Sequence, residues 1–218
     1  MKLNSDKTKI MIFNFTKKYQ FNTRIKMNSD LLEVVEKTKL LGVILKSDLT
    51  WDENTSYLIR NAYKRMPLLT KLYAYNCPIP DLITIYVTFI RSVLEHACVV
   101  WHSAITNEQT TDIERVQKTS LKIILKDKYQ NYNHALNILE LETLSERREQ
   151  LCLEFARKSS QNCDTKSMFP LKVKSKSKLN NEAYKVNFAS TERLKKSAIP
   201  YMQRLLNKNS QSKEKDKT

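Results

Sequence analysis

Glycine is almost absent from this sequence. Gly42 is the only glycine among 218 residues, and there are five prolines. Phosphate-binding loops of the GxGxxG and GxxxxGK[ST] kinds need several glycines, because the backbone must approach the phosphate groups closely. The scarcity therefore excludes these two classes of nucleotide-binding protein. Few glycines and prolines also favour long helices over sheets that are joined by tight turns.

Residues for metal binding and nucleophilic catalysis are also few. The three histidines are His96, His102 and His134, and the first two are too far apart for the i, i+4 pairing of an HExxH zinc motif. The four cysteines form no CxxC pair, and no serine or cysteine lies in a motif with a general base. We expect no metal site, no cofactor and no active site. Without a signal peptide, we expect an intracellular protein of the nucleus or cytoplasm that is not secreted.

Positive charge is what the sequence has in excess. The net charge is +15, and residues 166–218 hold 14 Lys and Arg against 4 Asp and Glu, which leaves +5 for residues 1–165. A field of this sign indicates an anionic partner, with nucleic acid before a membrane surface. The alternative is a solvated basic tail that has no specific partner.

The pattern of apolar residues predicts an α+β protein that is mainly α. We expect a small antiparallel sheet in residues 1–53, a helical bundle in 54–163, and a basic, partly disordered tail in 164–218 with a short helix near 199–207. The expected strands are 9–15, 23–27, 31–35 and 39–45. Gly42 interrupts the last of these, which indicates a bulge or a close approach of another backbone.

Residues 81–102 form the most apolar stretch, and we expect them to form one central helix. One helical stripe of this stretch contains Leu82, Tyr86, Phe89, Val93, Ala97 and Val100. Apolar residues on nearly every face predict burial between other elements, and the charged residues Arg91 and Glu95 argue against a bilayer span. Asp81 is placed to cap this helix, and Pro67 should kink or end the preceding one.

The preceding helix is cationic. Arg60, Lys64, Arg65 and Lys71 lie along it, and the tyrosines between them are Tyr57, Tyr63, Tyr73 and Tyr75. Such cations can bind phosphates, and tyrosine rings can stack on bases or sugars. The alternative is a basic amphipathic helix with tyrosines at the boundary of the core.

Several stretches, in this order, resemble the C-terminal part of reverse transcriptases from non-LTR retrotransposons of the jockey-like or LINE type. They are LNSDKTKIMIF (3–13), KLLGVILKSDLTW (39–51), IYVTFIRSVLEHACVVWH (85–102), IERVQKTSLKIIL (113–125), LETLSERREQLCLEFARK (141–158) and SAIPYMQRLLN (197–207). The resemblance covers nearly the whole chain. It implies the edge of a polymerase palm, a primer grip, a thumb and a C-terminal extension.

The resemblance also implies roles for particular residues. Lys7 and Lys9 match lysines that are proposed to lie near the leaving pyrophosphate, as accessory residues to catalysis. KLLGVIL (39–45) matches the primer grip, where Gly42 would let the backbone approach the primer strand, and Trp51 is a further candidate for nucleic-acid binding. The helices that follow would hold a template–primer duplex of RNA and DNA. In the full-length enzyme, palm aspartates of an Ala-Asp-Asp turn bind Mg²⁺.

No Ala-Asp-Asp turn occurs in this sequence. We therefore expect a fragment of an RNA-directed DNA polymerase that does not polymerise alone, retains template–primer binding, and could associate with the palm and fingers portion of the polymerase. The alternative is a non-catalytic helical protein-interaction module with an incidental basic surface.

Overall fold

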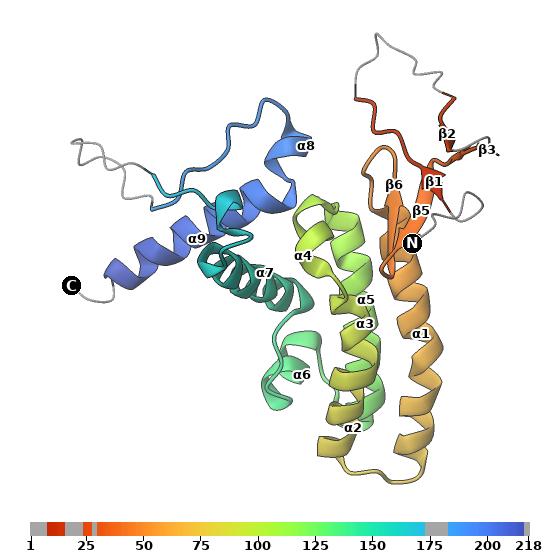
Figure 1. The fold of residues 1–218 in the computed structure, drawn as a ribbon. Helices are drawn as coiled ribbons and strands as arrows, with labels where there is room; N and C mark the ends of the chain where they lie inside the picture. The colour runs from red at the N-terminus through yellow and green to blue at the C-terminus, as the bar shows by residue number, and fades with distance from the viewer. Residues whose placement is uncertain (1–7, 16–23, 28–29, 173–182, 216–218) are drawn as a thin grey trace. The chain divides into compact units, whose positions relative to one another are not determined.

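The structure is a computed structural model that describes residues 8–15, 24–27, 30–172 and 183–215 (Figure 1). The chain divides into two compact units, Met1–Tyr57 and Leu58–Thr218, and the boundary falls inside helix α1 (Asp52–Ala74). The predicted fold class, α+β and mainly α, is confirmed. The unit boundary lies four residues after the predicted end of the β region, and the predicted bundle and tail belong to one unit.

The described residues of the first unit form six short strands in three separate pairs. These pairs are β1 (Lys9–Ile10) with β4 (Glu33–Val34), β2 (Lys26–Met27) with β3 (Asp30–Leu31), and β5 (Lys37–Leu40) with β6 (Val43–Lys46). The first pair is parallel and the other two are antiparallel. The described strands thus form three two-stranded sheets in place of the expected single antiparallel sheet.

The stretch expected as one strand, 39–45, is instead a hairpin. Leu40 pairs with Val43, so Leu41 and Gly42 alone make the turn. Both have positive φ, 47° and 88°, as a type I′ turn requires. Gly42 therefore serves the turn and does not make a bulge, because glycine adopts positive φ without a Cβ clash.

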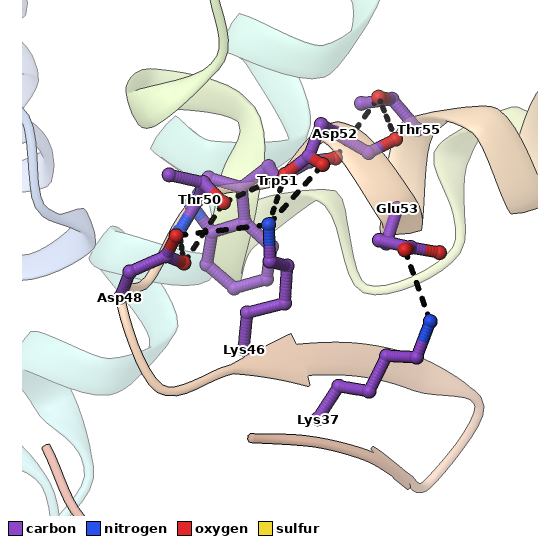
Figure 2. A network of polar contacts seen from close by, with 8 residues as sticks. All are labelled: Lys37, Lys46, Asp48, Thr50, Trp51, Asp52, Glu53 and Thr55. Carbon is purple, nitrogen blue, oxygen red and sulfur yellow. Dashed lines mark hydrogen bonds and ion pairs between the residues drawn. The ribbon is translucent and has the colours of Figure 1, made fainter.

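A polar network connects β6 with the start of α1 inside the first unit (Figure 2). The Lys46 ammonium lies 3.1 Å from Asp52 Oδ1 and 3.6 Å from Asp48 Oδ2. The Thr50 amide donates to Asp48 Oδ1 at 2.9 Å, and the Thr50 hydroxyl donates to Asp52 Oδ1 at 2.6 Å. The amide of Ile44 donates to the buried Asn54 side chain at 3.1 Å. These contacts set the direction in which the chain leaves the hairpin.

Helix α1 continues through Pro67 to Ala74. Pro67 was expected to kink this helix or to end its first half, and the helix does not end there. A proline inside a helix removes one backbone hydrogen bond, and the surrounding apolar face compensates for this loss. Leu58, Ala62, Met66 and Leu69 form this face and are nearly fully buried.

The central helical stretch is interrupted, although one continuous helix was expected. It consists of α2 (Ile79–Ile85), the π-helical segment η2 (Tyr86–Arg91), α3 (Ser92–Glu95), α4 (Cys98–Trp101) and η3 (His102–Ala104). Ala97 is left-handed, with φ 49°, and it separates α3 from α4. Asp81 lies in the first turn, but Pro78 occupies the N-cap position and no side chain caps the helix.

The π-helical turn also changes which residues face the core. From Leu82 to Cys98 the buried residues follow a spacing of four, and they are Leu82, Tyr86, Ile90, Leu94 and Cys98. Phe89 and Val100, expected to face inward, are 39% and 44% exposed. A π turn contains more residues than an α turn, so each step of four returns closer to the same side. The stretch is thus buried on one side and not all round.

Three further helices complete the bundle. They are α5 (Asn107–Leu125), α6 (Tyr132–Ile138) and α7 (Leu144–Gln161), with the short segment η4 (Lys126–Lys128) after α5. The predicted capping box of Thr106 and Gln109 is confirmed, since each side chain bonds the backbone amide of the other residue. Thr143 and Glu146 form a second capping box where the start of α7 was expected.

The C-terminal residues form more structure than a short helix near 199–207. Segment η5 (Lys166–Met168), α8 (Glu192–Lys195) and α9 (Ala198–Lys215) follow α7, and α9 packs against α7 (Figure 1). Their shared core consists of Cys152, Ala156, Phe169, Met202, Leu205 and Leu206. Residues 164–172 and 183–210 thus belong to the folded unit. The Lys/Ser-rich stretch expected to be disordered, 172–181, lies almost wholly outside the described residues.

Candidate nucleic-acid interface

Three of the four cations predicted on α1 lie on the same side of the helix. With about 100° of rotation per residue, Arg60, Lys64 and Lys71 lie within about 40° of one another around the axis. All three side chains are exposed, and the buried residues of α1 occupy the opposite side. We call the side defined by Arg60, Lys64 and Lys71 the α1 basic face.

Arg65 does not share this face. Its side chain is half-buried, and its guanidinium donates a hydrogen bond to the carbonyl of Phe89 in η2. The guanidinium carbon also lies 4.5 Å from the centre of the Phe89 ring. Through this hydrogen bond and the contact of its guanidinium with the Phe89 ring, Arg65 connects α1 with η2.

Carboxylates are absent from the neighbourhood of the α1 basic face along the sequence. No Asp or Glu occurs between Asn54 and Pro80. Within the part of the chain that the structure describes, no ion pair or hydrogen bond engages the side chains of Arg60, Lys64 or Lys71. The positive charge of the face is therefore uncompensated locally, and it can attract a polyanion.

The four tyrosines of the predicted surface differ in their availability. Tyr75 and Tyr63 are 84% and 41% exposed. Tyr57 is half-buried and its hydroxyl accepts a hydrogen bond from the Lys39 ammonium at 2.6 Å. The Tyr73 ring is covered by the Lys126 ammonium at 5.3 Å. Tyr63 and Tyr75 are therefore the two rings that could stack on a base.

The other predicted site residues lie in the first unit or its undescribed part. Lys7 lies outside the described residues. Lys9, in β1, forms an ion pair of 3.0 Å with Glu33. Gly42 lies in the hairpin turn, and Trp51 is buried, with 7% of its surface exposed. A ring as buried as Trp51 offers no face for stacking, so its role in this structure is in packing.

A buried polar network, which sequence reasoning missed, connects the helices of the second unit. Tyr86 Oη donates to Gln117 Oε1 at 2.5 Å, and Gln117 Nε2 donates to Tyr132 Oη at 2.9 Å. The Tyr132 hydroxyl donates to Glu114, which also accepts from the amide of Leu144 at 3.0 Å. Burial raises the pKa of both tyrosines, so both hydroxyls remain donors. The network organises the core and lies away from the α1 basic face.

The histidines occupy separate places. His102 accepts a hydrogen bond from Arg148 Nε at 3.3 Å, and burial together with the Arg148 charge lowers the pKa of His102 to about 4. Among the residues described, no three His, Cys, Asp or Glu side chains gather in a way that could hold a metal ion.

By length and composition, the stretch from Ile79 to Ala104 is long and apolar enough to cross a membrane. Its buried side chains, however, pack inside the second unit, and Tyr86 hydrogen-bonds to Gln117 there. Arg91 and Glu95 form an ion pair of 3.2 Å in which both side chains are largely buried. This combination is typical of a core helix of a folded domain.

No family model matches the chain, and neither a curated protein nor a solved structure is similar to it.

Proposed function

We propose that this chain corresponds to the C-terminal part of a non-LTR retrotransposon reverse transcriptase, and that it binds template–primer RNA or DNA through the α1 basic face. The observation that best supports this proposal is that Arg60, Lys64 and Lys71 are all exposed in a stretch without any carboxylate. The six sequence stretches that resemble these polymerases, and that follow one another in the same order, support the same proposal. On this proposal the protein acts inside the cell, in the nucleus or cytoplasm.

The geometry of the face suits a nucleic-acid backbone. Arg60 and Lys71 are separated by about 16 Å along the helix axis, at about 1.5 Å per residue. Cations spaced in this way neutralise several consecutive phosphates, and such contacts bind without reading the base sequence. The exposed Tyr75 ring adds a stacking surface beside Lys71.

Polymerisation is not part of the proposal. Polymerase chemistry uses paired carboxylates that bind two metal ions, and no two adjacent aspartates occur in this sequence. In the structure, the neighbouring Asp48 and Asp52 bind Lys46 and Thr50 instead. The residues present therefore do not fit the Mg²⁺ site of the full-length family enzyme.

The proposal is tested by binding of a labelled RNA–DNA hybrid at several salt concentrations. In the variant with Arg60, Lys64 and Lys71 all changed to Gln, three phosphate contacts are lost. The slope of log affinity against log salt should therefore fall by about 2 to 3. The matched control changes Lys158, Lys166 and Lys185 to Gln, which removes the same charge from exposed positions outside α1.

Equal affinity and equal salt slope in the two triple variants would contradict the α1 basic face as the binding surface. If the folded wild-type chain does not bind the hybrid even at low salt, nucleic-acid binding is refuted. We would then infer that the chain is a helical protein-interaction module, and the triple variant should still bind its protein partner.

The stacking role of Tyr75 is tested separately on single-stranded RNA. Tyr75→Ala should weaken binding by about 1 to 3 kcal/mol, because a base loses its aromatic partner. Tyr75→Phe keeps the ring and should bind like the wild type. Equal weakening by both substitutions would show that the hydroxyl, and not the ring, makes the contact.

A further inference from the structure

Arg148 is a buried cation whose terminal nitrogens have no hydrogen-bond partner among the residues that the structure describes. Its side chain in α7 is fully buried, and its Nε donates to His102. Neither Nη1 nor Nη2 has a hydrogen-bond partner among the described residues. A buried charge is normally paired, because desolvation of an isolated charge is unfavourable. The interior around Arg148 is therefore suited to a negative charge.

Two cysteines from different helices lie in this interior. Cys98 belongs to α4 and Cys152 to α7, and α4 packs against α7. Both thiols are free and nearly fully buried, and they hydrogen-bond to each other. Arg148 precedes Cys152 by four residues, so the two side chains lie on the same side of α7. The charge of Arg148 interacts with both the Cys98 and the Cys152 thiol.

The surroundings make the two thiols unequal. The hydrogen bond from Cys152 lowers the pKa of Cys98, and the Arg148 charge lowers it further, against burial and Glu95. The hydrogen bond with Cys98 and burial raise the pKa of Cys152, and Glu149 adds to this effect. Cys98 is thus the thiol that ionises first, and Cys152 keeps its proton.

We propose that Cys98 and Cys152 are a redox pair that hydrogen peroxide converts to a disulfide joining α4 to α7. The Cys98 thiolate attacks one peroxide oxygen, the O–O bond breaks, and the products are a sulfenic acid and hydroxide. The Cys152 sulfur then attacks the Cys98 sulfur, the S–O bond breaks, and the Cys152 thiol proton passes to the departing oxygen, which leaves as water. Peroxide is the oxidant that accepts the two electrons.

The disulfide would have a structural consequence. It would close a loop that includes α5, α6 and most of the buried polar network. Such a long closed loop restricts the unfolded chain strongly, so the oxidised protein should unfold at a higher temperature than the reduced one. The inference is independent of nucleic-acid binding, since neither cysteine lies on the α1 basic face.

The test uses the full chain with Cys77→Ser and Cys163→Ser, which leaves only the buried pair. Peroxide treatment of this folded variant should remove both free thiols, lower the intact mass by two hydrogens, and give a reducible cross-linked peptide containing Cys98 and Cys152. The exposed Cys163 of the wild-type chain reports that the peroxide dose is sufficient. The proposal is overturned if both thiols survive a dose that oxidises Cys163, or if they oxidise without cross-linking.

Two further variants assign the roles. With Cys152→Ser added, Cys98 should accumulate a sulfenic acid that dimedone traps. With Cys98→Ser added, Cys152 should give less adduct under the same conditions. Equal labelling of the two would refute Cys98 as the attacking thiol. Circular dichroism and the unfolding midpoint show that each variant is folded, and a reversible rise of that midpoint in the cross-linked chain distinguishes the disulfide from peroxide damage.

Discussion

The two units of this protein are stabilised by different interactions. Few described residues of the first unit are buried, and its strand pairs are accompanied by exposed ion pairs such as Lys9–Glu33 and Lys37–Glu53. The second unit has many fully buried apolar side chains, and its helices α5 and α7 begin with capping boxes. An exposed ion pair contributes about 0 to 1 kcal/mol, whereas a fully buried apolar side chain contributes about 1.5 to 3 kcal/mol. The free energy of folding therefore resides mainly in the second unit.

The difference in stability between the two units is tested most strongly by removing a core side chain. Leu94, in α3, is fully buried, and Leu94→Ala removes its contacts and leaves a cavity. We expect a loss of about 3 kcal/mol in the free energy of unfolding, measured by urea denaturation. The control is Leu41→Ala in the first unit, where the side chain is 88% exposed and the expected change is within about 0.5 kcal/mol. Similar losses in both variants would contradict the comparison.

The turn of the β5–β6 hairpin is the most sensitive position of the first unit. Gly42→Ala places a Cβ at a φ of 88°, and it should weaken the hairpin by about 1 to 2 kcal/mol. Leu41→Asn should strengthen the hairpin instead, because Asn-Gly is the preferred type I′ pair. Amide hydrogen exchange across β5 and β6 measures both effects. Faster exchange after Leu41→Asn would show that the turn is of another type.

The starts of α5 and α7 were the most predictable part of the fold, because they depend on local chemistry. The hydroxyl of Thr106 and the side chain of Gln109 satisfy each other's backbone amides, and a spacing of three residues is enough to recognise this. Most of the candidate site was equally predictable, since Arg60, Lys64 and Lys71 follow helical spacing. Placement of Arg65 required knowledge of Phe89, which is 24 residues away in sequence.

Features that depend on tertiary context were not predictable. The run from Lys39 to Leu45 looks like one strand because its turn contains Leu41, a residue that rarely adopts positive φ. The π-helical turn Tyr86–Arg91 has no composition signal, and within it Phe89 is 39% exposed while Ile90 is fully buried. The partnership of Arg148 with the distant Cys98 likewise appears only when α4 and α7 pack.

Within the second unit, removal of the α7 N-cap should destabilise the fold less than removal of a core side chain. Thr143→Ala removes the acceptor for the amide of Glu146, and it should cost about 1 kcal/mol in the free energy of unfolding. Thr143→Ser keeps the oxygen and should be nearly neutral. Thermal unfolding followed by circular dichroism measures the difference. A loss as large as that of Leu94→Ala would indicate that the cap also positions the core.

The smallest effect is expected from acid titration of the first unit. The amide of Thr50 lowers the pKa of Asp48, and the hydroxyl of Thr50, with Lys46, lowers the pKa of Asp52. Carboxylates with a lowered folded pKa stabilise the folded state above the unfolded pKa of about 4, and this contribution is lost as the pH falls through the folded pKa. Because both side chains are half exposed, solvent screening limits the effect to a few tenths of a kcal/mol.

The variant Asp48→Asn with Asp52→Asn provides the control for this titration. Hydrogen exchange at the start of α1 should become faster between about pH 4 and pH 2 in the wild type, after correction for intrinsic exchange, and the double variant should lack that step. High salt should diminish the ionic part of the effect, whereas the hydrogen bonds from Thr50 persist. If the wild-type β6–α1 connection became more protected on acidification, the two carboxylates would be destabilising. The stability of the first unit would then come mainly from its few buried side chains, just as the stability of the second unit comes from its apolar core.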